Sequence, residues 1–169
     1  MRWVLLLRGI NVGGNNTVPM KDLKALLEGL GHTHVKTYLN SGNATFESSK
    51  RSAVVLSADV EKMLLERLGL TIRACVRTDA QIVRALDELP DLPGYVVVGV
   101  LFDPPAPTVL TEFLVSSWPD VTMAGNDQVL YLGYGDGLHT SKLTNARIEK
   151  LLGVGCTART PSTLRKLLA

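Results

Sequence analysis

The hydrophobic residues at the start of the chain predict a strand, a helix and a hairpin. A short, wholly apolar run at residues 4–7 is typical of a buried strand. A helix that opens at Pro19 is indicated by apolar residues at helical spacing: Met20, Leu23, Leu26, Leu27 and Leu30. Residues 35–47 alternate between polar and apolar on both sides of the turn at residues 40–43, which predicts a hairpin.

A second helix and a fourth strand complete this first pattern. Residues 52–68 keep apolar side chains on one helical face, and Gly69 follows as a stop signal. A strand is predicted at residues 71–76. The order of the elements is then β-α-β-β-α-β, which is the order of a ferredoxin-like unit.

The same order returns after an inserted helix. Residues 78–81 have the sequence of a capping box, and the breaker at residues 90–94 is the predicted linker. Thr160 is expected to cap a terminal helix with Pro161 at its first position. The elements expected in between are a strand at 95–102, a helix ending near 118–119, a hairpin of 121–124 with 129–132, a helix at about 141–152 and a short strand at 156–158.

We therefore predict an α+β fold with two ferredoxin-like units in tandem, an inserted helix between them and a C-terminal helix. The predicted boundaries are an N-terminal unit at 1–77, a connecting helix and linker at 78–94, and a C-terminal unit at 95–169. Strands 4–7 and 95–102 lack alternation, so both of their faces should be covered. The inserted helices, the other repeat or another chain could provide that cover.

Composition and charge narrow the classes of partner. The chain has 169 residues and a formal net charge of +2, which is too balanced to favour nucleic acid or an anionic membrane. Its two cysteines lie far apart without metal-ligand spacing, which predicts a reduced, cytoplasmic protein. The first apolar run is too short for a signal peptide or a membrane span of about 20 residues, so we expect no targeting segment and no membrane partner.

Candidate chemistry gathers where the first strand ends. Arg8 is followed by a loop rich in glycine and asparagine, from which we take Asn11, Gly13 and Gly14 as candidate ligand contacts. A guanidinium in this place could hold an anionic ligand or pair with a structural carboxylate. The two glycines equally fit a plain turn, because neither a Walker A nor a Rossmann spacing is present.

Further candidate contacts come from one turn and two helix starts. A right-handed crossover makes the first two strands parallel, which brings Asn40, Ser41 and Asn43 to the same sheet edge as Arg8. Lys142 follows the glycine-rich stretch 133–137 near the start of a predicted helix, and Arg159 precedes another. Helix N-termini attract anions, so these cations extend the predicted site. Simple turn chemistry and a solvated surface lysine are the alternatives.

Several short segments form a recognisable set along the chain: residues 8–14, Met20, Leu23, residues 37–38, 41–43, 141–143 and 157–159, followed by residues 163–164. Together they resemble the DUF1697 family, a bacterial family of unknown function. The family pattern continues Thr-Ala-Arg with Asn-Trp, whereas Thr160 and Pro161 stand here. The resemblance implies a fold and a recurring set of residues, but no reaction.

We predict a protein that binds a small anionic ligand bearing a phosphate or carboxylate group. No motif decides whether it is an enzyme, and we expect neither a cofactor nor a metal. A nucleic-acid-binding module is one alternative, by analogy of fold alone, although stacking aromatic residues are sparse. A structural protein or homo-oligomer, whose apolar strands find partners in another chain, is the other.

Overall fold

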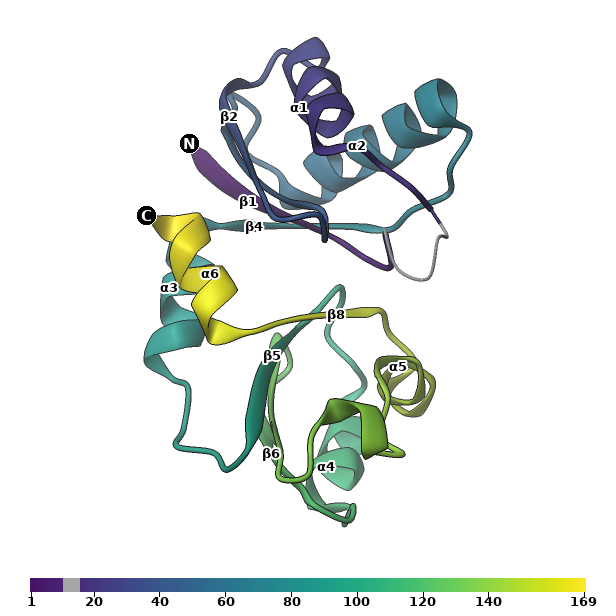
Figure 1. The fold of residues 1–169 in the computed structure, drawn as a ribbon, viewed down its shortest axis with the longest axis vertical. Helices are drawn as coiled ribbons and strands as arrows, with labels where there is room; N and C mark the ends of the chain where they lie inside the picture. Colours follow the sequence, from purple (N-terminus) through teal and green to yellow (C-terminus); the bar gives the residue numbers. More distant parts are fainter. Residues whose placement is uncertain (11–15) are drawn as a thin grey trace. The chain divides into compact units, whose positions relative to one another are not determined.

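The computed structural model describes residues 1–10 and 16–169 (Figure 1). The predicted contacts Asn11, Gly13 and Gly14 lie outside these residues. The chain divides into two compact units, one formed by Met1–Val83 with Lys166–Ala169 and the other by Arg84–Arg165. Both are mixed α+β structures, and each is described by itself.

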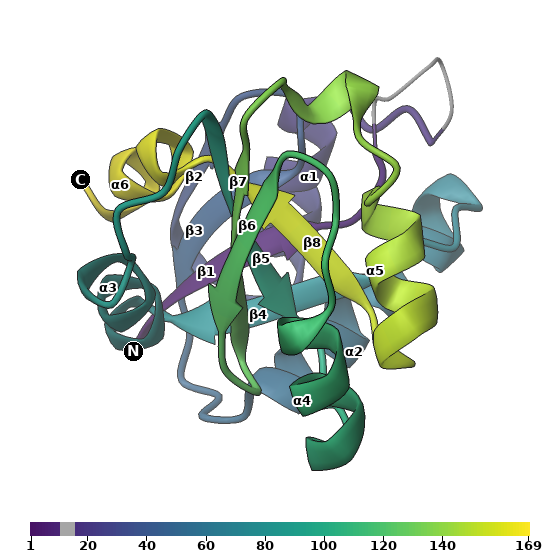
Figure 2. The ribbon, with the colours of Figure 1, turned by 90° about the horizontal axis from the view of Figure 1, so that it is seen from below.

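The first unit is built on a four-stranded antiparallel sheet. Its strands follow the order β2-β3-β1-β4, and α1 and α2 pack on one face (Figures 1 and 2). Trp3, Leu5 and Phe46 are buried beneath these two helices. The elements are β1 (Arg2–Leu7), α1 (Met20–Gly29), β2 (Thr33–Tyr38), β3 (Asn43–Glu47), α2 (Ala53–Leu68) and β4 (Ala74–Thr78), with α3 (Asp79–Asp87) leading into the second unit.

The second unit repeats the element order and the strand order of the first. Its sheet is also antiparallel and four-stranded, in the order β6-β7-β5-β8 (Figure 2). A helix, α4, stands between β5 and β6, as the predicted repeat requires. The elements are β5 (Tyr95–Leu101), α4 (Pro107–Val115), β6 (Val121–Gly125), β7 (Val129–Tyr134), the short 3₁₀ turn η1 (Leu138–Thr140), α5 (Asn145–Leu152) and β8 (Cys156–Arg159), followed by α6 (Pro161–Leu168).

The two apolar strands are buried on both faces, as their lack of alternation predicts. In β1, Leu5 and Leu7 join the core under α1 and α2. Val4 and Leu6 point to the opposite face and are equally inaccessible. Val98 of β5 is likewise fully buried.

Helix caps agree with the sequence at two places. Thr78 and Gln81 form the predicted capping box, in which Thr78 N donates to Gln81 Oε1 at 2.9 Å and Gln81 N donates to Thr78 Oγ1 at 3.2 Å. Thr160 caps α6 by accepting a hydrogen bond from Thr163 N at 3.3 Å. Local side-chain chemistry is sufficient to start both helices.

Three predicted boundaries are wrong, and one of them matters for the site. The helix expected to end near residues 118–119 ends at Val115. The strand expected at residues 71–76 begins at Ala74. The helix expected from about residue 141 begins at Asn145, because Thr144 is its N-cap and accepts from Arg147 N at 3.2 Å. Lys142 therefore precedes the cap and does not sit at a helix N-terminus.

The proline-rich segment at residues 90–94 packs closely against β7. A Cβ atom on Gly94 would lie 2.2 Å from the carbonyl oxygen of Tyr134, and one on Gly133 would lie 2.6 Å from that of Pro93. Two glycines thus allow the two backbones to approach each other. This segment is a packed part of the second unit.

His32 is a buried titratable group in the first unit. It lies between α1 and β2, is 5% exposed and stacks on Phe46 with ring centroids 4.4 Å apart. Its Nε2 has no hydrogen-bond partner among the described residues. Burial, and secondarily the charge of Lys50, lower the pKa of His32, while Asp59 acts in the opposite direction.

We expect the first unit to lose stability as the pH falls below about 6.5, the pKa of an unfolded histidine. In that range the unfolded chain binds a proton that the folded chain resists, with a slope of at most about 1.4 kcal/mol per pH unit. The free energy of unfolding, measured in urea at several pH values, should show this slope. His32→Phe should flatten it, whereas His139→Gln on an exposed turn should not. An unchanged slope in His32→Phe would contradict the assignment.

Candidate functional site

The predicted edge of the first unit brings the turn at residues 40–43 beside the end of β1. Leu6 pairs with Asn43 in the antiparallel ladder, and Leu7 N donates to Gly42 O at 3.0 Å. The next residue, Arg8, donates its backbone N–H to Arg73 O at 3.1 Å. The predicted location of this turn is confirmed, since β1 and β2 both run antiparallel to β3.

Asn43 has a structural task within this turn. It is fully buried, and its Nδ2 donates to Tyr38 O at 3.0 Å and to Ser41 Oγ at 2.9 Å. Its amide thereby ties the end of β2 to the start of β3. Asn40 is exposed and Ser41 is partly exposed at the turn.

The predicted cations are divided between the two units. Arg8 belongs to the first, and Lys142 and Arg159 belong to the second. The guanidinium of Arg159 donates to Thr157 Oγ1 at 2.8 Å and to Ala158 O at 2.9 Å, within its own strand. Lys142, by contrast, lines a pocket.

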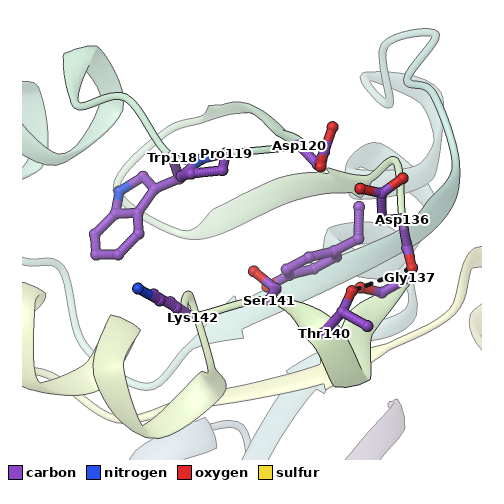
Figure 3. Close-up of a pocket in the computed structure, with 9 residues that line it drawn as sticks. Trp118, Pro119, Asp120, Asp136, Gly137, Thr140, Ser141 and Lys142 are labelled. Atoms are coloured by element: carbon purple, nitrogen blue, oxygen red, sulfur yellow. Dashed lines mark hydrogen bonds between the residues drawn. The ribbon is translucent and has the colours of Figure 1, made fainter.

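This pocket lies at the end of the β6–β7 hairpin where β6 begins and β7 finishes (Figure 3). Its volume is about 170 Å³. One wall comes from the connection between α4 and β6, and the other from the segment that follows β7. The lining residues are Trp118, Pro119, Asp120, Tyr134, Asp136, Gly137, Thr140, Ser141 and Lys142.

Hydrogen bonds hold the two walls together. Gly135 N donates to Asp120 O at 2.8 Å, which joins the loop before β6 to the loop after β7. Thr140 Oγ1 donates to the carbonyl oxygen of Asp136 or Gly137, each 3.2 Å away, and closes the second loop. The shape of the pocket is therefore set by backbone contacts.

Trp118 is fixed at one end of the pocket. Its Nε1 donates to Ser116 Oγ at 2.9 Å, and the guanidinium of Arg147 lies 5.3 Å from the centre of its ring. Figure 3 shows Lys142 at the same end, with its ammonium group near the indole. This end of the pocket is aromatic and positively charged.

Lys142 and Ser141 are the donors at this end. Lys142 forms no ion pair within the described part of the chain, and its side chain is exposed. Ser141 Oγ accepts a hydrogen bond from Leu143 N at 3.1 Å and keeps its own hydrogen for donation. An ammonium and a hydroxyl are suitable donors to an anionic oxygen.

Two carboxyl groups meet at the other end (Figure 3). A hydrogen bond to Asp136, and secondarily the charge of that group, raise the pKa of Asp120. Carboxylate oxygens accept hydrogen bonds, so the pair is suited to a cationic donor.

Tyr134 connects the pocket with a mostly apolar hollow of about 220 Å³. Its hydroxyl donates to Leu143 O at 2.8 Å. Burial, with a smaller effect of Cys156, raises the pKa of Tyr134 to about 12. The phenol is therefore neutral at physiological pH and serves as a packed wall of both spaces.

The sequence interpretation missed several of the side chains that line this pocket with Lys142. Trp118 was predicted only as the end of a helix, and Asp136 only as part of the glycine-rich stretch 133–137. In the structure, Gly133 and Tyr134 of that stretch belong to β7. Asp120 adopts a positive φ of 57°, for which no turn signature was read. The Gly-Asp-Gly pattern at residues 135–137 was the available signal for a shaped loop.

The described residues bring no three metal-ligating side chains of His, Cys, Asp or Glu together. Nor do they include a helix that is long and apolar enough to cross a membrane.

The fold has a counterpart among solved structures. A conserved bacterial protein from Streptococcus pneumoniae matches with a TM-score of 0.70 and 23% sequence identity, covering 99% of this chain and 96% of the other. This likeness concerns the fold alone. No curated protein shows significant similarity to the chain. The sequence model of DUF1697, described as a protein of unknown function, matches residues 1–131, and the chain therefore belongs to the DUF1697 family.

Proposed function

We propose that the protein binds a small ligand with a carboxylate at one end and a protonated amine at the other. The observation that carries this proposal is the charge arrangement of the pocket, in which the unpaired Lys142 stands beside Trp118 and away from the carboxyl pair (Figure 3). The proposal thus narrows the anionic ligand predicted from the sequence to one that carries a carboxylate and also an amine.

The cationic end suits a carboxylate. Lys142 and Ser141 offer two donors, and a charge-assisted hydrogen bond contributes about 1.5–3 kcal/mol in a favourable setting. Because Lys142 is exposed, water and salt reduce the contribution of its hydrogen bond to the free energy of binding.

The acidic end suits an amine. Asp136 lies close enough to Asp120 to raise the pKa of Asp120, through a hydrogen bond and its negative charge, and an ammonium would donate hydrogen bonds to both carboxylates and offset their repulsion. The same pair repels further negative charge, which favours a singly charged carboxylate over a phosphate dianion. A volume of about 170 Å³ limits the ligand to the size of a small amino acid or a related molecule.

Thermal shift and calorimetry with a panel of amino acids, simple carboxylates and phosphate esters test this proposal. A zwitterionic compound should bind best, and Lys142→Met should weaken it by about tenfold. Lys150→Met, at an exposed position on α5 outside the pocket, is the matched control. Equal binding by wild type and Lys142→Met would overturn the assignment.

Other features belong to the proposal as well. The strand order in each sheet supports two ferredoxin-like units, for which we retain the boundaries 1–77, 78–94 and 95–169. The buried cysteines fit a reducing, cytoplasmic location. A ligand contact through Arg8 and the neighbouring turn is a separate proposal, because those residues belong to the other unit.

A further inference from the structure

A second pocket opens on the sheet of the first unit, on the face turned away from α1 and α2. Thr45 lies between Ala44 and Phe46, which both belong to the core under those helices. Side chains alternate along a strand, so that of Thr45 points to the opposite face. The pocket there has a volume of about 280 Å³, and it is lined by Arg2, His34, Lys36, Thr45, Phe46, Glu47 and Ala169.

Thr45 is a polar side chain buried without a partner. It is 3% exposed, and no residue in the described ranges forms a hydrogen bond with its hydroxyl. Its oxygen is not among the fully enclosed polar atoms of the described residues, so the hydroxyl opens into the pocket that Thr45 lines. A ligand oxygen in this pocket can accept the hydrogen bond that the hydroxyl otherwise donates to water.

Lys36 is the exposed cation of the pocket. It pairs directly with Thr45 across β2 and β3, which places both side chains on one face. It is exposed and forms no ion pair with any described residue. An anion seated against Thr45 is therefore within the reach of a flexible ammonium group.

Arg2 is the fixed cation. Its guanidinium donates to Asp79 Oδ2 at 3.2 Å and to the carbonyl oxygens of Leu168 and Leu167 at 3.2 and 2.8 Å. Three anchors hold the group in place while its remaining N–H donors stay available. Asp79 balances part of its charge.

One acidic side chain also lines the pocket. Oε2 of Glu47 lies 3.3 Å from Nδ1 of His34, so the carboxylate of Glu47 already has the His34 imidazole as a partner.

We propose that this face of the first unit is an oxyanion site, in which Thr45, Lys36 and Arg2 hold a phosphate group. The inference does not depend on the Lys142 pocket, which belongs to the other unit. A phosphate has acceptors for a hydroxyl, an ammonium and a guanidinium at once.

Inorganic phosphate is the probe that tests this site. Titration of the full chain at constant ionic strength, followed by amide NMR, should give saturable shifts at Lys36 and Thr45. Lys36→Met and Thr45→Val should each weaken binding by about tenfold, whereas Thr45→Ser, which keeps the hydroxyl, should retain it.

Controls separate this site from surface charge and from the proposed function. Lys21→Met, at an exposed position on α1, and Lys142→Met should leave the phosphate affinity unchanged. Urea unfolding confirms that each variant is folded. Phosphate shifts that do not saturate, or equal affinity in wild type, Lys36→Met and Thr45→Val, would overturn the proposal. Loss of binding in Lys142→Met alone would place the phosphate in the other pocket and overturn it too.

Discussion

Replacing Gly94 by alanine is expected to destabilise the second unit by about 3–5 kcal/mol. The backbone of Gly94 has a φ of +75°, which is unfavourable for any residue with a Cβ atom. The new methyl group would also lie 2.2 Å from Tyr134 O and 2.7 Å from the Cα atom of Gly135. These neighbours are backbone atoms at the end of a central strand, so they cannot turn aside as a side chain could.

Gly153→Ala is the matched control for this variant. Its φ of +71° imposes nearly the same conformational penalty, but a Cβ atom there meets nothing within 4 Å. It should cost about 1–2 kcal/mol. Urea unfolding in a Trp3→Phe background, followed by the fluorescence of Trp118, reports on the second unit. Equal losses in the two variants would show that residues 90–94 do not pack on β7 as described.

Gly42→Ala should destabilise the first unit by about 2–4 kcal/mol. Gly42 has a φ of +78°, and a Cβ atom there would lie 2.6 Å from Leu7 Cβ and 2.8 Å from Ile10 Cδ1. Leu7 is held by the ladder of β1, so relief requires the turn to move away from the strand. That movement would break the hydrogen bond from Leu7 N to Gly42 O and displace the predicted edge near Arg8.

The corresponding control is Gly69→Ala, at the C-cap of α2. Its φ is +67° and no atom lies within 4 Å of the added methyl group, so the loss should be about 1–2 kcal/mol. The fluorescence of Trp3 in a Trp118→Phe background follows the first unit. If Gly42→Ala unfolds at the same urea concentration as Gly69→Ala, the close contact with β1 is wrong.

The pocket lies at the end of its hairpin opposite the β6–β7 turn. The sequence predicts chemistry in the first unit where β1 ends and where the hairpin turns, at Asn43. The corresponding hairpin turn of the second unit carries Asn126. Asn126 closes its own turn by accepting from Gln128 N at 2.8 Å and Val129 N at 3.0 Å. Trp118 and Asp136 line the same pocket because antiparallel strands bring the start of β6 beside the end of β7.

Much of the secondary structure could be predicted from the sequence alone. Periodicity of 3.6 residues identified α1 and α2, and unbroken apolar runs identified β1 and β5 as buried on both faces. The caps at Thr78 and Thr160 followed from local side-chain chemistry. These features depend on residues within a few positions of one another, so they can be predicted from the local sequence.

The tertiary structure decided the start of α5 and the composition of the pocket. Ser141 and Thr144 are both able to cap a helix. Leu143 packs into the core and its carbonyl oxygen accepts a hydrogen bond from the Tyr134 hydroxyl, which is consistent with a helix that begins only after Thr144. Asp120 and Asp136 are separated along the chain. They lie close together because β6 and β7 pair antiparallel, which brings the start of β6 beside the end of β7. The position of the Thr45 hydroxyl in its pocket likewise depends on the pairing of β2 with β3 and on the packing around them. Contacts between distant segments depend on strand pairing and packing, which local pattern does not encode.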